Sequence, residues 1–182
     1  MNHCGTRNLE TPRLLLRPLT LDDAQMMYDN WASDPAVTKY LRWEPHPSWV
    51  YTAELLHEWS KHYADSAYYQ WGICEKDTGV LFGSLCLGPG EPDPVWQGPM
   101  WEPGYCIGRR WWNKGYTTEA LCAVVQQQSF FVYIIDRRLQ HPAVFQAVER
   151  FPVELEPLLH RLRHARLRGK KICAQVILVR RD

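Results

Sequence analysis

The sequence predicts a single α/β domain built on a mixed sheet with flanking helices. Strand-like and helix-like segments follow one another as strand, three helices, hairpin, strand, helix and strand, an alternation typical of α/β domains. The chain has 182 residues and shows no internal repeat or low-complexity segment, which fits one domain with one hydrophobic core. We therefore expect residues 1–182 to form one domain.

The first half of the chain begins with a strand and continues with three helices. Residues 11–19 are apolar and bounded by prolines, so they predict the strand. Thr20, Asp34 and Ser48 are expected to cap the helices, because their side-chain oxygens accept bonds from the first helical amides. Apolar residues recur at helical spacing after each cap. They are Ala24, Met27, Tyr28 and Trp31, then Val37, Tyr40 and Leu41, and finally Trp49, Ala53, Leu56, Trp59 and Tyr63.

A hairpin is predicted over residues 69–75 and 80–87. Its turn reads Lys-Asp-Thr-Gly, and Gly79 suits the left-handed position of such a turn. Residues 88–104 follow, rich in proline and tryptophan. Their composition favours an irregular loop that resembles a lid more than a core element.

A strand at 104–108 and a later helix are predicted to frame a turn. The helix carries Leu121, Val124 and Val125 on one face. The apolar run 130–135 is then interpreted as a buried strand, although the end of a helix could give the same composition.

Composition excludes several classes of protein. No apolar run approaches the ~18 residues of a membrane span, and the first seven residues lack the apolar core of a signal peptide, so we expect a cytoplasmic protein. The six cysteines occur singly and the seven histidines show no metal-ligand spacing, which favours reduced thiols and no structural metal. Nine Trp and nine Tyr indicate an aromatic-lined cleft or partner surface, or an aromatic core.

Charge is unevenly distributed along the chain. The net charge is +1, yet residues 160–182 hold eight Lys or Arg and one acidic residue. A basic tail of this kind can contact nucleic acid but is more often a solvated face, so nucleic acid is an unlikely partner.

The turn around Gly115 is the strongest candidate for a binding site. It lies between the strand-like residues 105–107 and a helix that begins with two threonines. Glycine allows a tight turn close to a ligand, and the first amides and the dipole of a helix attract anions. A phosphate could therefore bind there, with Thr117 or Thr118 supplying a hydroxyl. A plain capped helix gives the same pattern, and the Walker and dinucleotide-binding glycine patterns are absent.

Three segments together resemble a known family. They read Leu9-Glu-Thr-Pro-Arg-Leu-Leu-Leu-Arg-Pro, Gly83-Ser-Leu, and Gly104-Tyr-Cys-Ile-Gly-Arg-Arg-Trp-Trp-Asn-Lys-Gly-Tyr-Thr-Thr-Glu-Ala-Leu121. Over residues 9–135 the chain resembles GNAT acetyltransferases, and within them the RimJ/RimL-like branch that acts on ribosomal-protein N-termini. The resemblance implies an acetyl-CoA-dependent N-acetyltransferase, with a GNAT-like mixed, mostly antiparallel sheet, flanking helices and a splayed pair of parallel strands. The acceptor would be a small amine or a protein N-terminus, and the enzyme a monomer or homodimer.

The resemblance also assigns the cofactor-binding residues. Pantetheine would bond to the strand, and the pyrophosphate would lie on the six-residue turn 112–117 with Gly115 at its centre. Trp112 and Thr117 stand where many members carry other residues, but main-chain donors tolerate such changes. The residues are Tyr105, Cys106, Ile107, Trp112, Asn113, Lys114, Gly115, Tyr116, Thr117 and Thr118.

Glu102 is the candidate general base. The amine must lose a proton before it attacks the thioester, and the family often places a glutamate just before this strand. Trp101 and Pro103 could desolvate the carboxylate and raise its pKa, although a solvated loop glutamate is an equal alternative. An amide near Cys106 or Ile107 could stabilise the oxyanion. Cys106 itself is better interpreted as a packed small residue than as a nucleophile.

The resemblance ends beyond Arg137. Residues 138–161 do not match the family, and no tyrosine follows Tyr133, so the family's usual leaving-group tyrosine is missing. A local double frameshift or a remodelled segment would both give this pattern. Departure of the thiolate would then rely on water. The alternative function is a catalytically degenerate GNAT-fold module that binds CoA or a partner without turnover.

Overall fold

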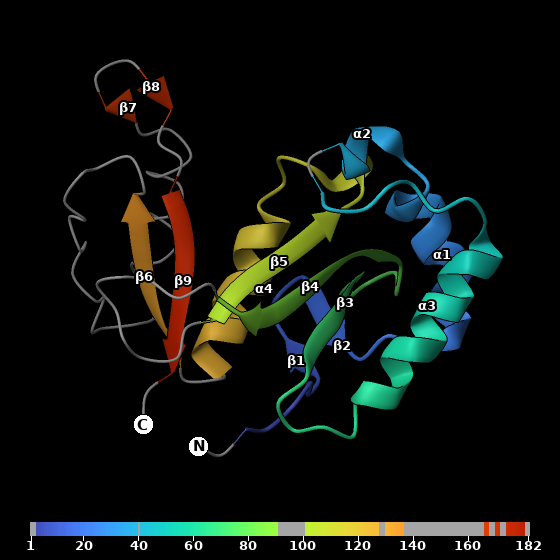
Figure 1. Cartoon of the computed structure of the whole chain (residues 1–182), viewed down its shortest axis with the longest axis horizontal. Helices are drawn as coiled ribbons and strands as arrows, with labels where there is room; N and C mark the ends of the chain where they lie inside the picture. The colour runs from blue at the N-terminus through green and yellow to red at the C-terminus, as the bar shows by residue number, and fades with distance from the viewer. Residues whose placement is uncertain are drawn as a thin grey trace. The chain divides into compact units, whose positions relative to one another are not determined.

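The computed structural model describes residues 3–39, 41–90, 101–127, 130–136, 166–167, 170–171 and 174–180 (Figure 1). The chain forms two compact units. The first comprises Met1–Leu87 and Gly104–Ala120, and the second comprises Gly88–Pro103 and Leu121–Asp182. The predicted lid falls largely in residues 91–100 and the unmatched segment in residues 138–161, so both lie outside the described residues.

The sheet of the first unit follows the order β1-β2-β3-β4-β5. Its pairs β1–β2, β2–β3 and β3–β4 are antiparallel, which confirms the predicted mixed α/β class with a mainly antiparallel sheet. The strands are β1 (Leu9–Glu10), β2 (Leu14–Arg17), β3 (Tyr69–Glu75), β4 (Leu81–Pro89) and β5 (Trp101–Ile107).

Two strand boundaries differ from the prediction. The segment 11–19, predicted as one strand, is a turn followed by β2. The Thr11 N–H donates to the Leu14 carbonyl at 2.9 Å, and the Leu14 N–H donates to Thr11 Oγ1 at 2.8 Å. These local bonds reverse the chain, so the preceding residues pair back onto β2 as β1. Strand β5 begins at Trp101, ahead of the predicted residue 104.

Strands β4 and β5 approach each other closely at Gly83. A Cβ atom at Gly83 would lie 2.5 Å from the Cys106 carbonyl oxygen and 2.6 Å from Ile107 Cδ1. The Gly108 N–H also donates to the Phe82 carbonyl at 2.9 Å. Glycine at position 83 therefore allows the two backbones to pack at this distance.

The helices begin at the predicted caps. Thr20 and Asp23 form a capping pair, in which the Thr20 N–H donates to Asp23 Oδ2 at 2.8 Å. Asp34 Oδ1 accepts from the Ala36 N–H at 2.9 Å, and Ser48 Oγ accepts from the Tyr51 N–H at 3.2 Å. The elements are η1 (Leu21–Asp23), α1 (Ala24–Met27), the π-helical η2 (Tyr28–Ala32), α2 (Pro35–Thr38) and α3 (Trp49–His62).

The first predicted helix is thus not a continuous α-helix, because it passes from a 3-10 turn through α1 into the π-helical η2. Helices α1 and α3 lie side by side (Figure 1). Across the described residues, no helix is long and apolar enough to cross a bilayer.

The hydrophobic core lies between these helices and one face of the sheet. Trp31 and Leu56 from the helices join Cys74, Leu81 and Cys106 from the strands. Aromatic residues serve both as core and as surface. The fully buried ones include Trp31, Tyr69, Trp71 and Phe82, whereas Trp43, Trp49 and Tyr51 are exposed. Tyr40 lies outside the described residues.

Asp23 and His46 are among the polar residues that are buried in this unit. Asp23 accepts two bonds of 2.7 Å from the Arg17 guanidinium. Burial alone would raise the pKa of Asp23, but the bonds from Arg17 and Thr20 hold it below its ordinary value. His46 Nδ1 lies 2.8 Å from Thr52 Oγ1, and burial lowers the pKa of this imidazole.

The second unit is organised around β9 (Ala174–Arg180). All seven residues of β6 (Phe130–Asp136) pair with β9 in antiparallel fashion, and Trp101 of β5 pairs with Leu178 of β9. In the sheet order, β9 lies between β5 and β6. A separate two-stranded sheet joins β7 (Arg166–Leu167) to β8 (Lys170–Lys171).

Candidate functional site

The turn predicted to bind phosphate connects η3 (Arg109–Trp111) to helix α4 (Tyr116–Gln127). Two residues of the turn have left-handed backbone conformations, Asn113 with φ 62° and Gly115 with φ 79°. Glycine and asparagine are the residues that adopt this conformation most readily. The Glu119 N–H donates to the Gly115 carbonyl at 3.0 Å, so α4 begins immediately after Gly115.

This geometry suits an anion. The first amides of an α-helix have no acceptor within the helix, and the helix dipole adds partial positive charge at the same end. Left-handed residues in a turn also direct successive N–H groups towards one side, which forms a concave anion site. The predicted role of residues 112–117 is therefore compatible with their backbone.

The side chains of the turn fix it to the sheet. The Trp111 indole N–H donates to Glu75 Oε1 at 2.9 Å, and the Tyr116 hydroxyl donates to the same oxygen at 3.2 Å. The ring of Phe82 in β4 lies 5.3 Å from that of Trp111 and 5.0 Å from that of Tyr116. One glutamate and one phenylalanine thus hold both ends of the turn.

A second attachment comes from the chain before β2. Arg13 Nε donates to Glu119 Oε2 at 2.6 Å, and Arg13 Nη1 donates to the Lys114 carbonyl at 3.1 Å. Thr11 Oγ1 adds a bond of 2.6 Å to Glu119 Oε1. The guanidinium carbon of Arg13 also lies 4.5 Å from the centre of the Tyr116 ring. A single side chain therefore contacts the middle of the turn and the first turn of α4.

The last residues of strand β5 before the turn differ in exposure. Tyr105 is 54% exposed, whereas Cys106 and Ile107 are buried. The Trp112 indole N–H donates to the Ile107 carbonyl at 2.6 Å, so Trp112 links the turn to the end of β5. Burial raises the pKa of Cys106 to about 12, which disfavours a thiolate and agrees with the packed role expected for this residue.

The two threonines of α4 differ in accessibility. Thr118 is buried, and Thr117 is half-buried. Lys114 is exposed beside them. Thr117 is therefore better placed than Thr118 to offer a hydroxyl to a ligand.

Glu102 lies within β5, not in a preceding loop as predicted. The side chains of Glu102, Trp101 and Pro103 are all half-buried. These three residues belong to the second unit, and Tyr105 belongs to the first. The role of Glu102 as general base stays a prediction.

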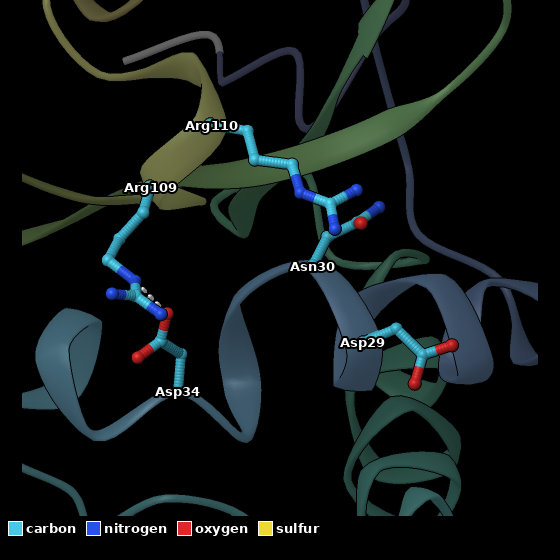
Figure 2. A pocket seen from close by; sticks show the side chains of 5 residues that line it. All are labelled: Asp29, Asn30, Asp34, Arg109 and Arg110. Carbon is cyan, nitrogen blue, oxygen red and sulfur yellow. Dashed lines mark hydrogen bonds and ion pairs between the residues drawn. The ribbon is translucent and has the colours of Figure 1, made fainter.

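A pocket of about 260 Å³ opens beside η3 (Figure 2). Asp34 and Arg109 form an ion pair across it. Asn30 donates to the Leu81 carbonyl at 2.6 Å, and Asp29 accepts from Gln25 at 2.9 Å. Arg110 has no hydrogen-bond or ion-pair partner among the described residues. The lining residues are Asp29, Asn30, Asp34, Arg109 and Arg110.

The sequence did not single out a role for Arg13, Glu75 or Glu119, although Arg13 and Glu119 stand in the segments that resemble the family. Their partners lie far away along the chain, since 106 residues separate Arg13 from Glu119. In the described ranges, no group of three or more His, Cys, Asp or Glu is arranged to hold a metal ion.

Comparison with known proteins identifies the domain. The family model described as "Acetyltransferase (GNAT) domain" matches residues 13–131, a range that includes Arg13, the hairpin, β5, the turn and α4. The chain belongs to the GNAT acetyltransferase family. The match ends before the segment that the sequence already separated from the family pattern.

Two curated relatives share part of this GNAT domain. The uncharacterized N-acetyltransferase p20 of Bacillus licheniformis is 28% identical over 113 residues, which are 62% of this chain and 61% of that protein. The uncharacterized N-acetyltransferase YoaA of Bacillus subtilis is 29% identical over 117 residues, 64% of this chain and 63% of that protein. The match thus spans about three fifths of each relative.

Solved GNAT structures share the fold at low identity. A GNAT-family acetyltransferase from Bacillus anthracis has a TM-score of 0.54 at 12% identity and covers 94% of this chain and 96% of its own. A ribosomal-protein-S5-alanine acetyltransferase from Vibrio fischeri has a TM-score of 0.53 at 11% identity and covers 97% of both chains.

Proposed function

We propose that this GNAT protein is an N-acetyltransferase that transfers the acetyl group of acetyl-CoA to a primary amine, on a small molecule or a protein N-terminus. The observation that carries the proposal is the turn at 112–117, whose left-handed Asn113 and Gly115 lead directly into α4. This turn lies inside the matched domain. Such a backbone suits the pyrophosphate of CoA.

The strand before the turn supplies the second part of the proposed cofactor site. Main-chain groups of Tyr105, Cys106 and Ile107 would bond to pantetheine along the edge of β5. The Ile107 carbonyl already accepts from Trp112, so its second lone pair is the one available to a ligand. The exposed Tyr105 ring lies on the same segment.

Acetyl transfer needs a base for the amine. The amine nitrogen attacks the thioester carbonyl carbon, a C–N bond forms and the C–S bond breaks. In our proposal Glu102 accepts the amine proton, an amide of β5 near Cys106 or Ile107 stabilises the oxyanion, and water protonates the leaving thiolate. The acceptor class is supported by the N-acetyltransferase names of the two relatives.

Cofactor binding is tested by calorimetry with CoA. The wild type is expected to bind with a dissociation constant on the order of micromolar, and Gly115→Asp is expected to abolish binding. That change adds a negative charge beside the phosphates at a left-handed position. Gly79→Asp is the matched control, because Gly79 is also left-handed (φ 70°) but lies in the hairpin turn, where an added Cβ atom would meet nothing within 4 Å. Equal loss in both variants, or no binding to the wild type, would overturn the assignment.

Turnover is tested by thiol release over a panel of small amines and N-terminal peptides. Glu102→Gln is expected to abolish release while CoA binding persists, because the amide cannot accept the proton. Release that persists in this variant would remove Glu102 from the mechanism.

A further inference from the structure

We propose that Arg13 is a positioning residue that orients the Lys114–Gly115 peptide for binding the pyrophosphate. This inference rests on the proposed function, because it assigns a role within the proposed CoA site. Arg13 is far from the turn at 112–117 in the sequence but contacts it in the folded protein.

The orientation follows from one hydrogen bond. Arg13 Nη1 donates to the Lys114 carbonyl oxygen at 3.1 Å. In a trans peptide the carbonyl and the next N–H point in opposite directions, and no described peptide bond is cis. The Gly115 N–H therefore points away from the guanidinium. A phosphate on that side meets a donor instead of a carbonyl oxygen.

Such a constraint is needed because of the glycine itself. Gly115 has φ 79°, and glycine adopts positive and negative φ with similar ease. The peptide before it can therefore rotate at little steric cost. Rotation would turn the Lys114 carbonyl towards the ligand and replace attraction by repulsion. The residue that allows the turn thus also allows its inactive orientation.

Arg13 is itself held in place from several directions. Its Nε and Nη2 atoms lie 2.6 Å and 2.5 Å from Glu119 Oε2. Thr11 Oγ1 and the Arg13 N–H donate to the other oxygen, Glu119 Oε1, at 2.6 Å and 3.1 Å. The Tyr116 ring supports the guanidinium through a cation–π contact of 4.5 Å. The side chain therefore holds the Lys114 carbonyl with little freedom of its own.

The effect is one of position more than of charge. We call the Arg13–Glu119 ion pair, together with the bond from Arg13 to the Lys114 carbonyl, the clamp. Glu119 neutralises the charge of Arg13 within it, so the pair adds little net attraction for a phosphate. A planar guanidinium can bond to Glu119 and to the Lys114 carbonyl together, whereas a lysine ammonium is a point charge without this fork geometry. We therefore expect Arg13→Lys to keep the ion pair with Glu119 and to lose the hydrogen bond that orients the Lys114–Gly115 peptide.

The test compares two probes on three proteins. CoA carries the pyrophosphate and pantetheine lacks it. The proteins are the wild type, Arg13→Lys and the control Lys76→Gln. Lys76 follows β3 and lies next to Arg13, because its N–H donates to the Arg13 carbonyl at 2.9 Å. Its ammonium pairs with Glu10 at 2.8 Å. The control thus removes a nearby positive charge without touching the Lys114 carbonyl.

Arg13→Lys is expected to bind CoA about tenfold more weakly, as for the loss of one well-placed hydrogen bond. Its affinity for pantetheine should stay within about twofold of wild type. The control should resemble the wild type with both probes. CoA binding by Arg13→Lys within about twofold of wild type overturns the proposal. An equal loss for both probes, or an equal loss in the control, also overturns it, since it would indicate general destabilisation or a charge effect.

A second variant keeps the proposal testable if Arg13→Lys does not fold. Glu119→Gln leaves Arg13 in the chain but weakens its anchor, and we expect a smaller loss confined to CoA. Unchanged CoA affinity in a folded Glu119→Gln protein would count against the clamp. Absence of CoA binding in the wild type would instead refute the proposed function itself, and the inference with it.

Discussion

Gly83→Ala is the substitution for which the structure predicts the clearest effect. The new methyl group would meet the Cys106 carbonyl oxygen at 2.5 Å and Ile107 Cδ1 at 2.6 Å, with Ile107 Cα at 3.3 Å. Two of these three atoms belong to the backbone of β5, so they cannot be relieved by a change of rotamer. Strand β5 must move away from β4, and the bond from Gly108 to the Phe82 carbonyl lies beside this contact.

The magnitude follows from the nature of the contact. Overpacking a core typically costs ~1–3 kcal/mol, and a rigid backbone neighbour places this site at the upper end. Burial of the added methyl group returns only ~0.8 kcal/mol. We therefore expect a net loss of about 2 kcal/mol in the free energy of unfolding. For a chain of this size that is a fall in melting temperature of roughly 4–8 °C.

The assay is urea unfolding of Gly83→Ala beside Gly88→Ala. Gly88 lies in the same strand β4, but a Cβ atom there meets nothing within 4 Å. The control should be as stable as the wild type or slightly more so, since alanine restricts the unfolded chain. CoA affinity should fall only in Gly83→Ala, because β5 is the proposed pantetheine strand. Equal stability of the two variants within about 0.5 kcal/mol would refute the close approach of β4 and β5.

Three further outcomes follow from buried polar groups. Asp23→Asn should lower the free energy of unfolding, measured by urea unfolding, by about 3 kcal/mol, because it leaves the partly buried Arg17 without its counter-charge. The control Asp22→Asn changes the exposed neighbouring aspartate and should cost less than about 0.5 kcal/mol. Burial lowers the pKa of His46 in the folded protein below the ordinary value of 6.5, so on acidification the imidazole is protonated in the unfolded chain before it is protonated in the folded protein. The free energy of unfolding should therefore fall as the pH drops below about 6.5. A His46→Gln variant whose stability falls equally steeply would contradict this. Cys106, with its pKa raised to about 12, should resist alkylation at pH near 8 until the protein is unfolded, and fast labelling of the native protein would show that the thiol is accessible.

The features that the sequence predicted correctly are governed by local physics. The caps at Asp34 and Ser48 need only a side-chain oxygen next to the first helical amides. Gly79 and Gly115 adopt the left-handed conformations that their turns require. The predicted alternation of strands and helices also depends on local periodicity, and the matched family domain has the same architecture.

Other features depend on residues far apart in the chain. The π-helical turn at 28–32 accompanies a bond from Asn30 to Leu81, 51 residues away. The position of β9 between β5 and β6 depends on pairing between strands that no local pattern relates. Residues 11–19 form a turn at Thr11 followed by β2, and the bonds between Thr11 and Leu14 that make this turn are local. The prediction missed the turn because the apolar residues that follow it indicated one continuous strand.

The turn at 112–117 combines both kinds of determinant. Glycine at 115 is a local requirement, and it is visible in the sequence because so few residues satisfy it. The direction of the Lys114–Gly115 peptide is not determined locally. In our proposal it depends on the guanidinium of Arg13, which stands 101 positions before Lys114 in the sequence. Under our proposal, a sequence with the same turn but another residue at position 13 would match the turn pattern equally well and bind a pyrophosphate less tightly. The proposal thus makes the arginine before β2 part of the phosphate site, and a search for such sites would gain specificity if it included both segments.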